Sequence, residues 1–246
     1  MKKLVCYWSG PLLKWAEKSL VSMRDSADGN EVIMYTDGLS DEDQEWFDGL
    51  GDGFSAPLMD AERWKKESMC YRVSLLKELA EASPDGTEII SIDLDTIVQG
   101  DLFTVFEKEF DVFVTSRGYP YHYSVNAGCW GFKVSDKSKE FLEYFTQQLK
   151  KPTWPAYVRF LEEITKLRGN SSTWWLDQDF LCCLYDYGPP IKDLVIQDAS
   201  PKYNYTYDET SAPISDIVKD YKSKLGDEKY LMLHLKGPLK DVFYDN

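Results

Sequence analysis

Two aspartates separated by a single leucine, Asp93 and Asp95, interrupt an otherwise apolar stretch of the chain. Ile89-Ile90-Ser91-Ile92 comes before them and Thr96-Ile97-Val98 comes directly after. Two charges are costly in apolar surroundings unless they are paired or bound to a metal ion. Carboxylates at this spacing can face one hard cation, directly or through water. We therefore predict a metal-binding role for the pair, and a structural ion pair is the alternative.

Two acidic residues on either side of one residue are, by themselves, weak evidence for a metal site. The chain has 42 acidic residues among 246, for which about seven such pairs are expected by chance. Asp41-Glu42-Asp43 and Asp177-Gln178-Asp179 share the pattern. The first opens a predicted surface helix, where acids interact favourably with the helix dipole, and we interpret it as a solvated face. The apolar neighbours of Asp93 and Asp95 distinguish that pair.

His234, one of two histidines, ends the apolar stretch Tyr230–Leu233 and begins the pattern H-x-x-G-x-x-K. A neutral imidazole can complete a coordination shell begun by carboxylates. Gly237 allows the backbone to approach a phosphate, and Lys240 supplies positive charge. Considered alone, a histidine after a strand is more often structural. His122 lacks such a context and is predicted to lie in a loop.

Together these residues predict a concrete chemistry. A divalent cation held by Asp93, Asp95 and His234 would neutralise a diphosphate and make it a better leaving group. Lys240 and a basic residue of the long predicted helix, best placed at Arg72, would assist.

The elements that must position these side chains alternate between strands and helices, which indicates an α/β fold with a mostly parallel sheet and helices on both faces. In such sheets ligands bind at the carboxyl ends of the strands, where the motifs fall. The predicted strands are Lys3–Ser9, Glu31–Tyr35, Glu88–Ile92, Asp111–Thr115, Cys129–Val134 and Tyr230–Leu235. The predicted helices are Pro11–Arg24, a short one after Ser40, Ala61–Ala82, Ser138–Leu149 and Asp179–Tyr187.

Composition narrows the classes of protein. The chain is 43% hydrophobic with a net charge of -14, which excludes intrinsic disorder and argues against nonspecific binding to nucleic acid. Because no long apolar run occurs, no transmembrane helix is expected. The five cysteines form no C-x-x-C pair and lie in apolar stretches, so we expect reduced core thiols and a cytoplasmic location.

Further motifs occur in a recognisable order over most of the chain. They are Tyr71-Arg72-Val73 through Leu79, Ile90 to Val98, Val125-Asn126-Ala127-Gly128, Leu176-Asp177-Gln178-Asp179-Phe180-Leu181, Ser200-Pro201-Lys202-Tyr203-Asn204, and His234 to Lys240. This ordered set resembles the GT-A glycosyltransferases, especially glycosyltransferase family 8, which includes glycogenin-like enzymes and bacterial lipopolysaccharide galactosyltransferases. The resemblance implies one GT-A domain over residues 1–246, with residues 1–115 mainly binding nucleotide and residues 116–246 mainly binding sugar and acceptor.

Two segments depart from the family pattern. The chain reads Lys240-Asp241-Val242 where the family usually continues K-P-W. Its opening, Cys6-Tyr7-Trp8-Ser9-Gly10-Pro11, lacks the usual acidic pair. This opening is similar to the W-x-G-P start of capsule-type, DXD-containing sugar transferases, which makes Trp8 a candidate donor contact.

The resemblance also implies roles for individual residues. Asp93, Asp95 and His234 would hold Mn2+ or Mg2+. The implied contacts of the nucleotide-sugar donor are Trp8, Arg72, Asp93, Ala127, Gly128, Gly237 and Lys240. The implied catalytic residues around the transferred sugar are Asn126, Asp177, Gln178 and Asp179. Without the family pattern, Asn126 to Gly128 would be interpreted as a turn and Asp177 as a helix N-cap.

The implied reaction moves a sugar, from UDP-hexose in the first instance, to a carbohydrate or glycoconjugate hydroxyl with retention at the anomeric carbon. Attack by the acceptor on the front face is favoured over a covalent intermediate on Asp177 or Asp179, and Gln178 is no realistic nucleophile. Aromatic rings suit sugar binding, so Trp154, Trp174 and Trp175 are acceptor candidates, with core packing the alternative. Two other classes stay open, a sugar-nucleotide nucleotidyltransferase and a non-catalytic carbohydrate-binding protein derived from a transferase.

Overall fold

The computed structural model describes residues 1–26, 29–67, 69–117, 123–169, 176–199, 202–206, 213–236 and 239–240. The strands are β1 (Lys2–Trp8), β2 (Glu31–Thr36), β3 (Phe54–Ser55), β4 (Glu88–Ile92), β5 (Thr96–Val98), β6 (Val112–Ser116), β7 (Val125–Lys133), β8 (Ile196–Asp198) and β9 (Met232–His234). The helices are α1 (Lys14–Ser26), α2 (Asp41–Asp48), α3 (Ala61–Glu67), α4 (Met69–Ala82), the 3-10 helix η1 (Leu102–Glu107), α5 (Asp136–Lys150), α6 (Pro155–Arg168), α7 (Leu176–Tyr187) and α8 (Ile214–Lys224).

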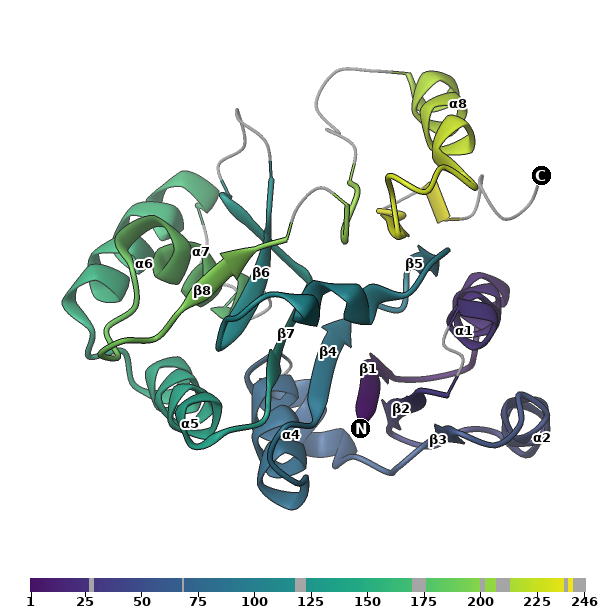
Figure 1. Cartoon of the computed structure of the whole chain (residues 1–246), viewed down its shortest axis with the longest axis horizontal. Coiled ribbons are helices and arrows are strands. Elements are labelled where there is room, and N and C mark those ends of the chain that lie inside the picture. The colour runs from purple at the N-terminus through teal and green to yellow at the C-terminus, as the bar shows by residue number, and fades with distance from the viewer. Residues whose placement is uncertain are drawn as a thin grey trace.

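Seven strands form the central sheet in the order β3-β2-β1-β4-β7-β6-β8 (Figure 1). Strand β7 runs antiparallel to β4 and β6, whereas the β1–β2, β1–β4, β2–β3 and β6–β8 pairs are parallel. Strands β5 and β9 form a separate antiparallel pair. The prediction of an α/β fold with a mostly parallel central sheet is confirmed.

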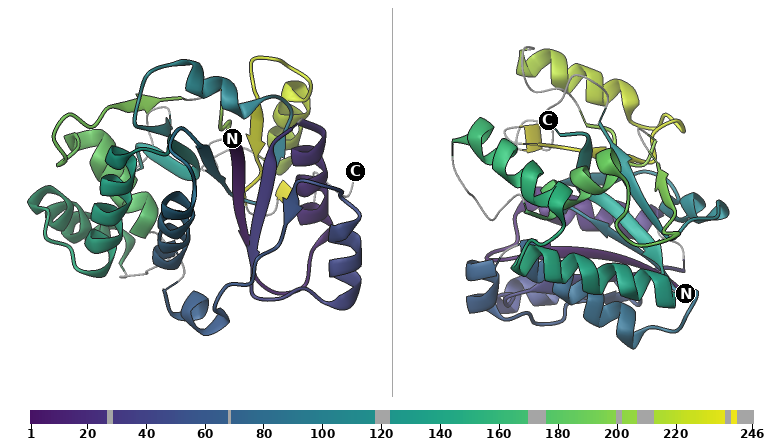
Figure 2. Two further views of the ribbon diagram at one scale, coloured as in Figure 1. Left: turned by 60° about the horizontal axis from the view of Figure 1, so that its bottom comes forward. Right: turned by 90° about the vertical axis from the view of Figure 1, so that its left-hand side faces the viewer.

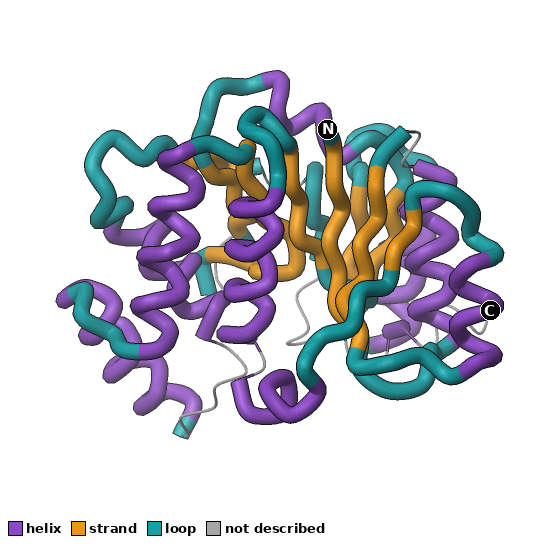
Figure 3. The backbone as a smooth tube through the Cα atoms, turned by 90° about the horizontal axis from the view of Figure 1, so that it is seen from below, coloured by secondary structure: helices purple, strands orange, loops and turns teal. Residues whose placement is uncertain are grey.

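Helices cover both faces of the sheet. Helices α4, α5, α6 and α7 lie on one side of it, and α1 and α2 lie on the other, as Figure 2 and the view from below in Figure 3 show. Side chains alternate between the two faces of a strand. Val5 and Ile89 therefore join the core beneath α4, α5 and α7. Their neighbours Leu4, Cys6 and Ile90 join the core beneath α1 and η1.

Local sequence explains where several helices begin and end. Ser40 caps α2 by accepting a hydrogen bond from the backbone N–H of Asp43. Ser135 and Ser138 form a reciprocal capping box at the start of α5. Gly169 ends α6 with a φ of 71°, in the left-handed region that favours glycine. These caps satisfy backbone groups that a helix leaves unpaired at its ends.

The prediction of a single helix over Ala61–Ala82 is wrong, because the structure has the two helices α3 and α4 there. The guanidinium of Arg63 reaches Ser74 Oγ at 3.2 Å, and Tyr71 Oη accepts a hydrogen bond from the backbone N–H of Asp60 at 3.1 Å. Residues eleven positions apart in a continuous helix would be separated by roughly 16 Å along its axis. The chain therefore bends between α3 and α4, so that α3 lies back against α4. All the side chains of α3 are partly or fully exposed, whereas α4 buries residues from Tyr71 to Leu76.

Other predicted elements exist with shifted ends. The strand expected at Cys129–Val134 is the second half of the longer strand β7, and the helix expected at Asp179–Tyr187 begins three residues earlier. The short strands β3, β5 and β8, the 3-10 helix η1 and the helices α6 and α8 were not predicted. Among the helices that the structure describes, none is both long and apolar enough to cross a membrane.

Candidate metal and sugar-nucleotide site

The small sheet of β5 and β9 brings the C-terminal histidine to the two aspartates. Thr96 at the start of β5 pairs directly with His234 at the end of β9. The backbone N–H of Leu235 donates to the carbonyl of Asp95 at 2.7 Å, and that of Asp93 donates to the carbonyl of Gly128 at 3.0 Å. The loop between β4 and β5 is therefore fixed by backbone bonds to both β9 and β7.

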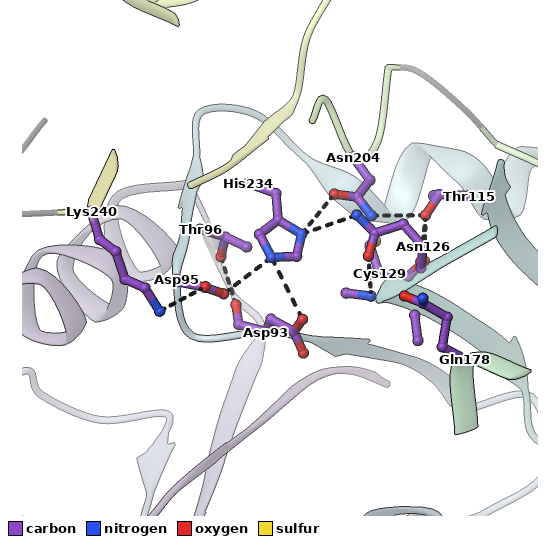
Figure 4. A network of polar contacts seen from close by, with 12 residues as sticks. Asp93, Asp95, Thr96, Thr115, Asn126, Cys129, Gln178, Asn204, His234 and Lys240 are labelled. Carbon is purple, nitrogen blue, oxygen red and sulfur yellow. Dashed lines mark hydrogen bonds and ion pairs between the residues drawn. The ribbon is translucent and has the colours of Figure 1, made fainter. Parts of the chain in front are cut away.

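Three potential metal ligands converge at this point (Figure 4). One ligand atom each from Asp93, Asp95 and His234 lies within 4.8 Å of the others. His234 Nε2 is 3.1 Å from Asp95 Oδ1 and 3.6 Å from Asp93 Oδ2. Carboxylates are the ligands that hard cations such as Mn2+ and Mg2+ prefer, and imidazole is a common ligand of divalent transition metals. The cluster could therefore hold a divalent cation.

Lys240 adds positive charge beside this cluster. Its Nζ is 3.0 Å from Asp95 Oδ2 and lies over the ring of Trp15, 4.5 Å from the ring centroid. Burial would raise the pKa of Asp95, but His234 and the Lys240 ammonium outweigh it and hold that pKa well below its usual range. Asp95 is therefore ionised and able to bind a cation.

Gly128 on β7 leaves room for the cluster. A Cβ atom at this position would lie 2.2 Å from His234 Cε1 and 2.8 Å from Asp93 Oδ2. Non-bonded atoms do not come within 3.0 Å of a Cβ atom. A larger residue would therefore displace the imidazole or the carboxylate. Glycine is therefore needed at position 128, because any side chain would occupy the space of the cluster.

Arg72 on α4 connects the cluster to the sheet. Its buried guanidinium binds Asp93 Oδ1 at 2.7 Å, Ser91 Oγ at 2.9 Å and the carbonyl of Ala127 at 3.1 Å. Burial alone would lower the pKa of Arg72, but the carboxylates of Asp93 and Asp177 outweigh it and raise that pKa. Arg72 is therefore a fixed cation next to the potential metal ligands.

Asp177 and Gln178, in the first turn of α7, carry buried polar atoms that have no hydrogen-bond partner among the described residues. Asp177 Oδ1 accepts the backbone N–H of Gln178 at 2.7 Å, while its Oδ2 is 4.0 Å from Arg72 Nη1. Within the described residues, neither Asp177 Oδ2 nor Gln178 Nε2 has a hydrogen-bond partner. Burial raises the pKa of Asp177 to about 7, although Arg72 opposes the shift. Orphaned buried polar atoms are rare in native proteins and suit a ligand that both donates and accepts hydrogen bonds.

Asp179, the last acid of this motif, has a different environment. Its carboxylate is fully buried and both of its oxygens bind the guanidinium of Arg168, with Arg168 Nη1 at 2.8 Å from Oδ2. Arg168 also binds the hydroxyl of Tyr123. These contacts anchor α7 to the end of α6, and the catalytic role predicted for Asp179 stays a prediction.

Asn126 and Ala127 lie in strand β7, so interpreting Asn126 to Gly128 as a turn is wrong. The side chain of Asn126 reaches His234 Nδ1 at 3.3 Å and accepts the backbone N–H of Gly128 at 2.9 Å. Strand β7 thus contributes a backbone carbonyl to Arg72 and a side chain to His234.

Trp8 and Trp154, two further predicted residues, are held by contacts with other aromatic rings. Trp8 ends β1, where its indole N–H donates to the carbonyl of Gly10 at 2.9 Å and its ring meets Trp15 edge-on. Trp154 packs edge-on against Phe180, which supports the core alternative for this residue. Gly237, Trp174, Trp175 and His122 lie outside the described residues. The five cysteines are unpaired, and all except Cys70 are buried, as expected.

Three residues of the site were missed or left without a role. Ser91 binds Arg72, Thr115 binds Asn204, and Asn204 reaches His234 Nδ1 at 3.3 Å. Ser91 and Thr115 carry no sequence signal beyond a polar side chain in an apolar strand. Asn204 belongs to a recognised motif, but its partner is distant in the sequence.

The strand order, the helices on both faces and the acid-rich site at the carboxyl end of β4 define the GT-A glycosyltransferase fold. Structures of glycosyltransferases share it. The galactosyltransferase LgtC, solved with donor and acceptor sugar analogues, matches with a TM-score of 0.55 and 13% identity over 96% of this chain and 87% of LgtC. Mouse xyloside xylosyltransferase 1 matches with a TM-score of 0.56 and 12% identity over 97% of this chain and 99% of its own.

A third similar structure is a glycosyltransferase involved in glycosylation of the major capsid of PBCV-1, with a TM-score of 0.51 and 15% identity over 99% of this chain and 97% of its own. No protein-family model and no curated protein matches the chain. At these identities the comparisons show a shared fold, and the activity has to be argued from the site.

Proposed function

We propose that this protein is a metal-dependent glycosyltransferase. It transfers a sugar from a nucleotide-diphosphate donor, UDP-hexose in the first instance, to a hydroxyl of a carbohydrate or glycoconjugate. The convergence of Asp93, Asp95 and His234 within 4.8 Å carries the proposal, because these side chains come from two distant parts of the chain. The GT-A fold of the solved glycosyltransferases supports it.

The three converging residues would hold Mn2+ or Mg2+. Such a cation supplies charge neutralisation at the diphosphate and makes the nucleoside diphosphate a better leaving group. Lys240, already 3.0 Å from Asp95, provides a second positive charge on the same side of the cluster. It would stabilise the negative charge that develops on the leaving group. Gly237 would let the backbone approach the same phosphates.

Arg72, Asp177 and Gln178 would surround the transferred sugar. The orphaned Oδ2 of Asp177 can accept a hydrogen bond from a sugar hydroxyl, and the orphaned amide N–H of Gln178 can donate one. Asn126 and Ala127, on the adjoining strand, complete this side of the donor site.

We propose retention by front-face attack of the acceptor hydroxyl. A covalent glycosyl-enzyme needs a free carboxylate beneath the anomeric carbon, and both oxygens of Asp179 are occupied by Arg168. The pKa of about 7 for Asp177 makes this carboxyl a weaker candidate for a permanent anion. Asp177 would instead bind and orient a hydroxyl. A cytoplasmic location is consistent with the unpaired cysteines.

Thermal melting with nucleotide and metal tests the proposal. UDP with Mn2+ at about one hundred times its Kd should stabilise the protein by about 2.7 kcal/mol, or about 5–10 °C for a chain of this length. UDP with EDTA should have little effect. Asp95→Asn should abolish the metal-dependent shift and hydrolysis of the donor. Asp41→Asn is the matched control, because Asp41 belongs to the same kind of acidic pattern on the exposed face of α2.

A panel of UDP- and GDP-sugars, assayed for metal-dependent donor hydrolysis, would then identify the donor. Failure of every nucleotide to stabilise the protein in the presence of Mn2+ would contradict the proposal and favour a non-catalytic carbohydrate-binding protein. Full activity of Asp95→Asn would contradict the metal assignment.

A further inference from the structure

His234 is placed between two asparagine side chains on one edge of its ring and two carboxylates on the other (Figure 4). Its Nδ1 is 3.3 Å from Asn204 Oδ1 and 3.3 Å from Asn126 Nδ2. Its Nε2 faces Asp95 and Asp93. The imidazole and both amides are buried, so water cannot easily replace these partners.

The orientation of the Asn204 amide follows from Thr115. Thr115 Oγ1 lies 3.0 Å from the carbonyl oxygen of Asn126 and 2.8 Å from that of Cys129, so its single proton is directed at a carbonyl. Its lone pairs are then left to accept the Asn204 amide N–H, 2.9 Å away. Because the NH2 group faces Thr115, the amide oxygen of Asn204 must face His234 Nδ1.

The orientation of the Asn126 amide is opposite. Its oxygen accepts the backbone N–H of Gly128 at 2.9 Å. Its NH2 group therefore faces His234 Nδ1. One asparagine thus offers Nδ1 an acceptor and the other offers it a donor.

A neutral imidazole carries one proton, and a ring nitrogen that binds a cation must be free of it. If Nε2 binds a cation, the proton is on Nδ1 and needs an acceptor, which Asn204 Oδ1 provides. If the proton is on Nε2, it is donated to Asp95 at 3.1 Å and Nδ1 accepts from Asn126. Each tautomer of His234 therefore has a complete set of partners.

We propose that Asn204 is a positioning residue that selects the cation-binding tautomer of His234, and that Asn126 supports the other tautomer. The inference rests on the proposed metal-dependent function. In the cation-binding tautomer, Nδ1 carries the proton and donates it to Asn204 Oδ1, while Nε2 is left free to bind the cation. Hydrogen bonds to the second nitrogen of a metal-bound histidine typically change metal affinity 10–100-fold.

Two substitutions at one position test this role through Mn2+ affinity, measured by electron paramagnetic resonance of free Mn2+. Asn204→Leu keeps the approximate volume but removes the acceptor, and should weaken binding about 10–100-fold. Asn204→Asp keeps an acceptor oxygen for Nδ1 and should bind Mn2+ at least tenfold more tightly than Asn204→Leu. Thermal melting without metal checks that each variant is folded. Equal Mn2+ affinity of folded Asn204→Leu would overturn the inference.

The tautomer itself can be observed by long-range 1H–15N correlation of the imidazole. The chain has two histidines, so a His122→Gln background leaves one imidazole to assign. With diamagnetic Mg2+ bound, the proton should be on Nδ1, and in Asn204→Leu without cation it should be on Nε2.

A proton that stays on Nε2 in the Mg2+-bound protein would overturn the inference even if Asn204→Leu fails to fold. Absence of any Mn2+ or Mg2+ binding by the unsubstituted protein would instead refute the proposed function, and this inference with it.

Discussion

Asp177 is a buried carboxyl group whose neutralisation should raise stability and lower activity. Burial raises its pKa to about 7, and its Oδ2 has no hydrogen-bond partner among the described residues. The substitution Asp177→Asn keeps the shape and retains an oxygen that can accept the backbone N–H of Gln178, while removing the charge. Asp177 is therefore a favourable position for separating a functional requirement from a structural one.

The magnitude follows from the shifted pKa. The folded protein holds the Asp177 proton up to about pH 7, whereas the unfolded chain releases it near the ordinary value of 3.8. Between these values the folded state binds more protons, so the stability of the unsubstituted protein falls as pH rises. At 1.36 kcal/mol per pKa unit, the buried Asp177 carboxyl lowers the free energy of unfolding by about 4 kcal/mol at pH 8. The reduction is only about 1–2 kcal/mol at pH 5.

Urea unfolding at pH 5 and pH 8, without nucleotide or divalent cation, measures this effect. We expect Asp177→Asn to be more stable than the unsubstituted protein, with a gain that is about 2–3 kcal/mol larger at pH 8 than at pH 5. Sugar transfer should fall about 10–100-fold, because a hydrogen bond to a charged group contributes about 1.5–3 kcal/mol. Asp41→Asn, on exposed α2, is the control. It should change the free energy of unfolding by no more than about 0.5 kcal/mol and leave sugar transfer unchanged. Destabilisation at pH 8, or a gain independent of pH, would refute the reasoning.

Substitutions at four other positions test further contacts of the structure. Gly128→Ala should weaken Mn2+ binding at least tenfold by titration, because its Cβ would lie 2.2 Å from the imidazole of the cluster. Gly131→Ala, on the same strand, should instead lower the free energy of unfolding by about 1–3 kcal/mol, because its Cβ would lie 2.3 Å from a main-chain oxygen. Arg72→Lys keeps the charge but loses the forked hydrogen bonds, and should lower kcat/KM for donor hydrolysis about tenfold or more. It should also lower the melting temperature, because Ser91 Oγ and the carbonyl of Ala127 lose a buried donor. Arg168→Met should destabilise the protein by about 3–5 kcal/mol in urea by leaving the Asp179 carboxylate unpaired, and adding Asp179→Leu should recover most of that loss.

Several parts of the site could be predicted because they depend on local sequence. Asp93 and Asp95 stand out because charges between apolar strand residues need a partner. The ordered motifs indicated the GT-A fold, and the structure brings His234 to Asp95 as the metal proposal requires. The strands β1 and β4 were also predicted, because each is a short run of mainly apolar residues.

Other parts could not be predicted because they depend on contacts between distant residues. The bend between α3 and α4 is stabilised by Arg63 reaching Ser74, which helical periodicity does not reveal. Asp177 and Asp179 belong to one sequence motif, from which a shared catalytic role was predicted. In the structure Asp177 faces Arg72, whereas Asp179 binds Arg168 at the end of α6.

The sequence by itself determined the candidate metal ligands Asp93, Asp95 and His234 and the main strands of the sheet, because residue type and periodicity are local properties. Only the tertiary structure decided how these groups share protons and charge. The pairing of β5 with β9 places His234 against Asp95, and Thr115 orients the Asn204 amide toward the imidazole. Hydrogen-bond direction and burial depend on neighbours that folding brings together, so they exist only in the folded chain.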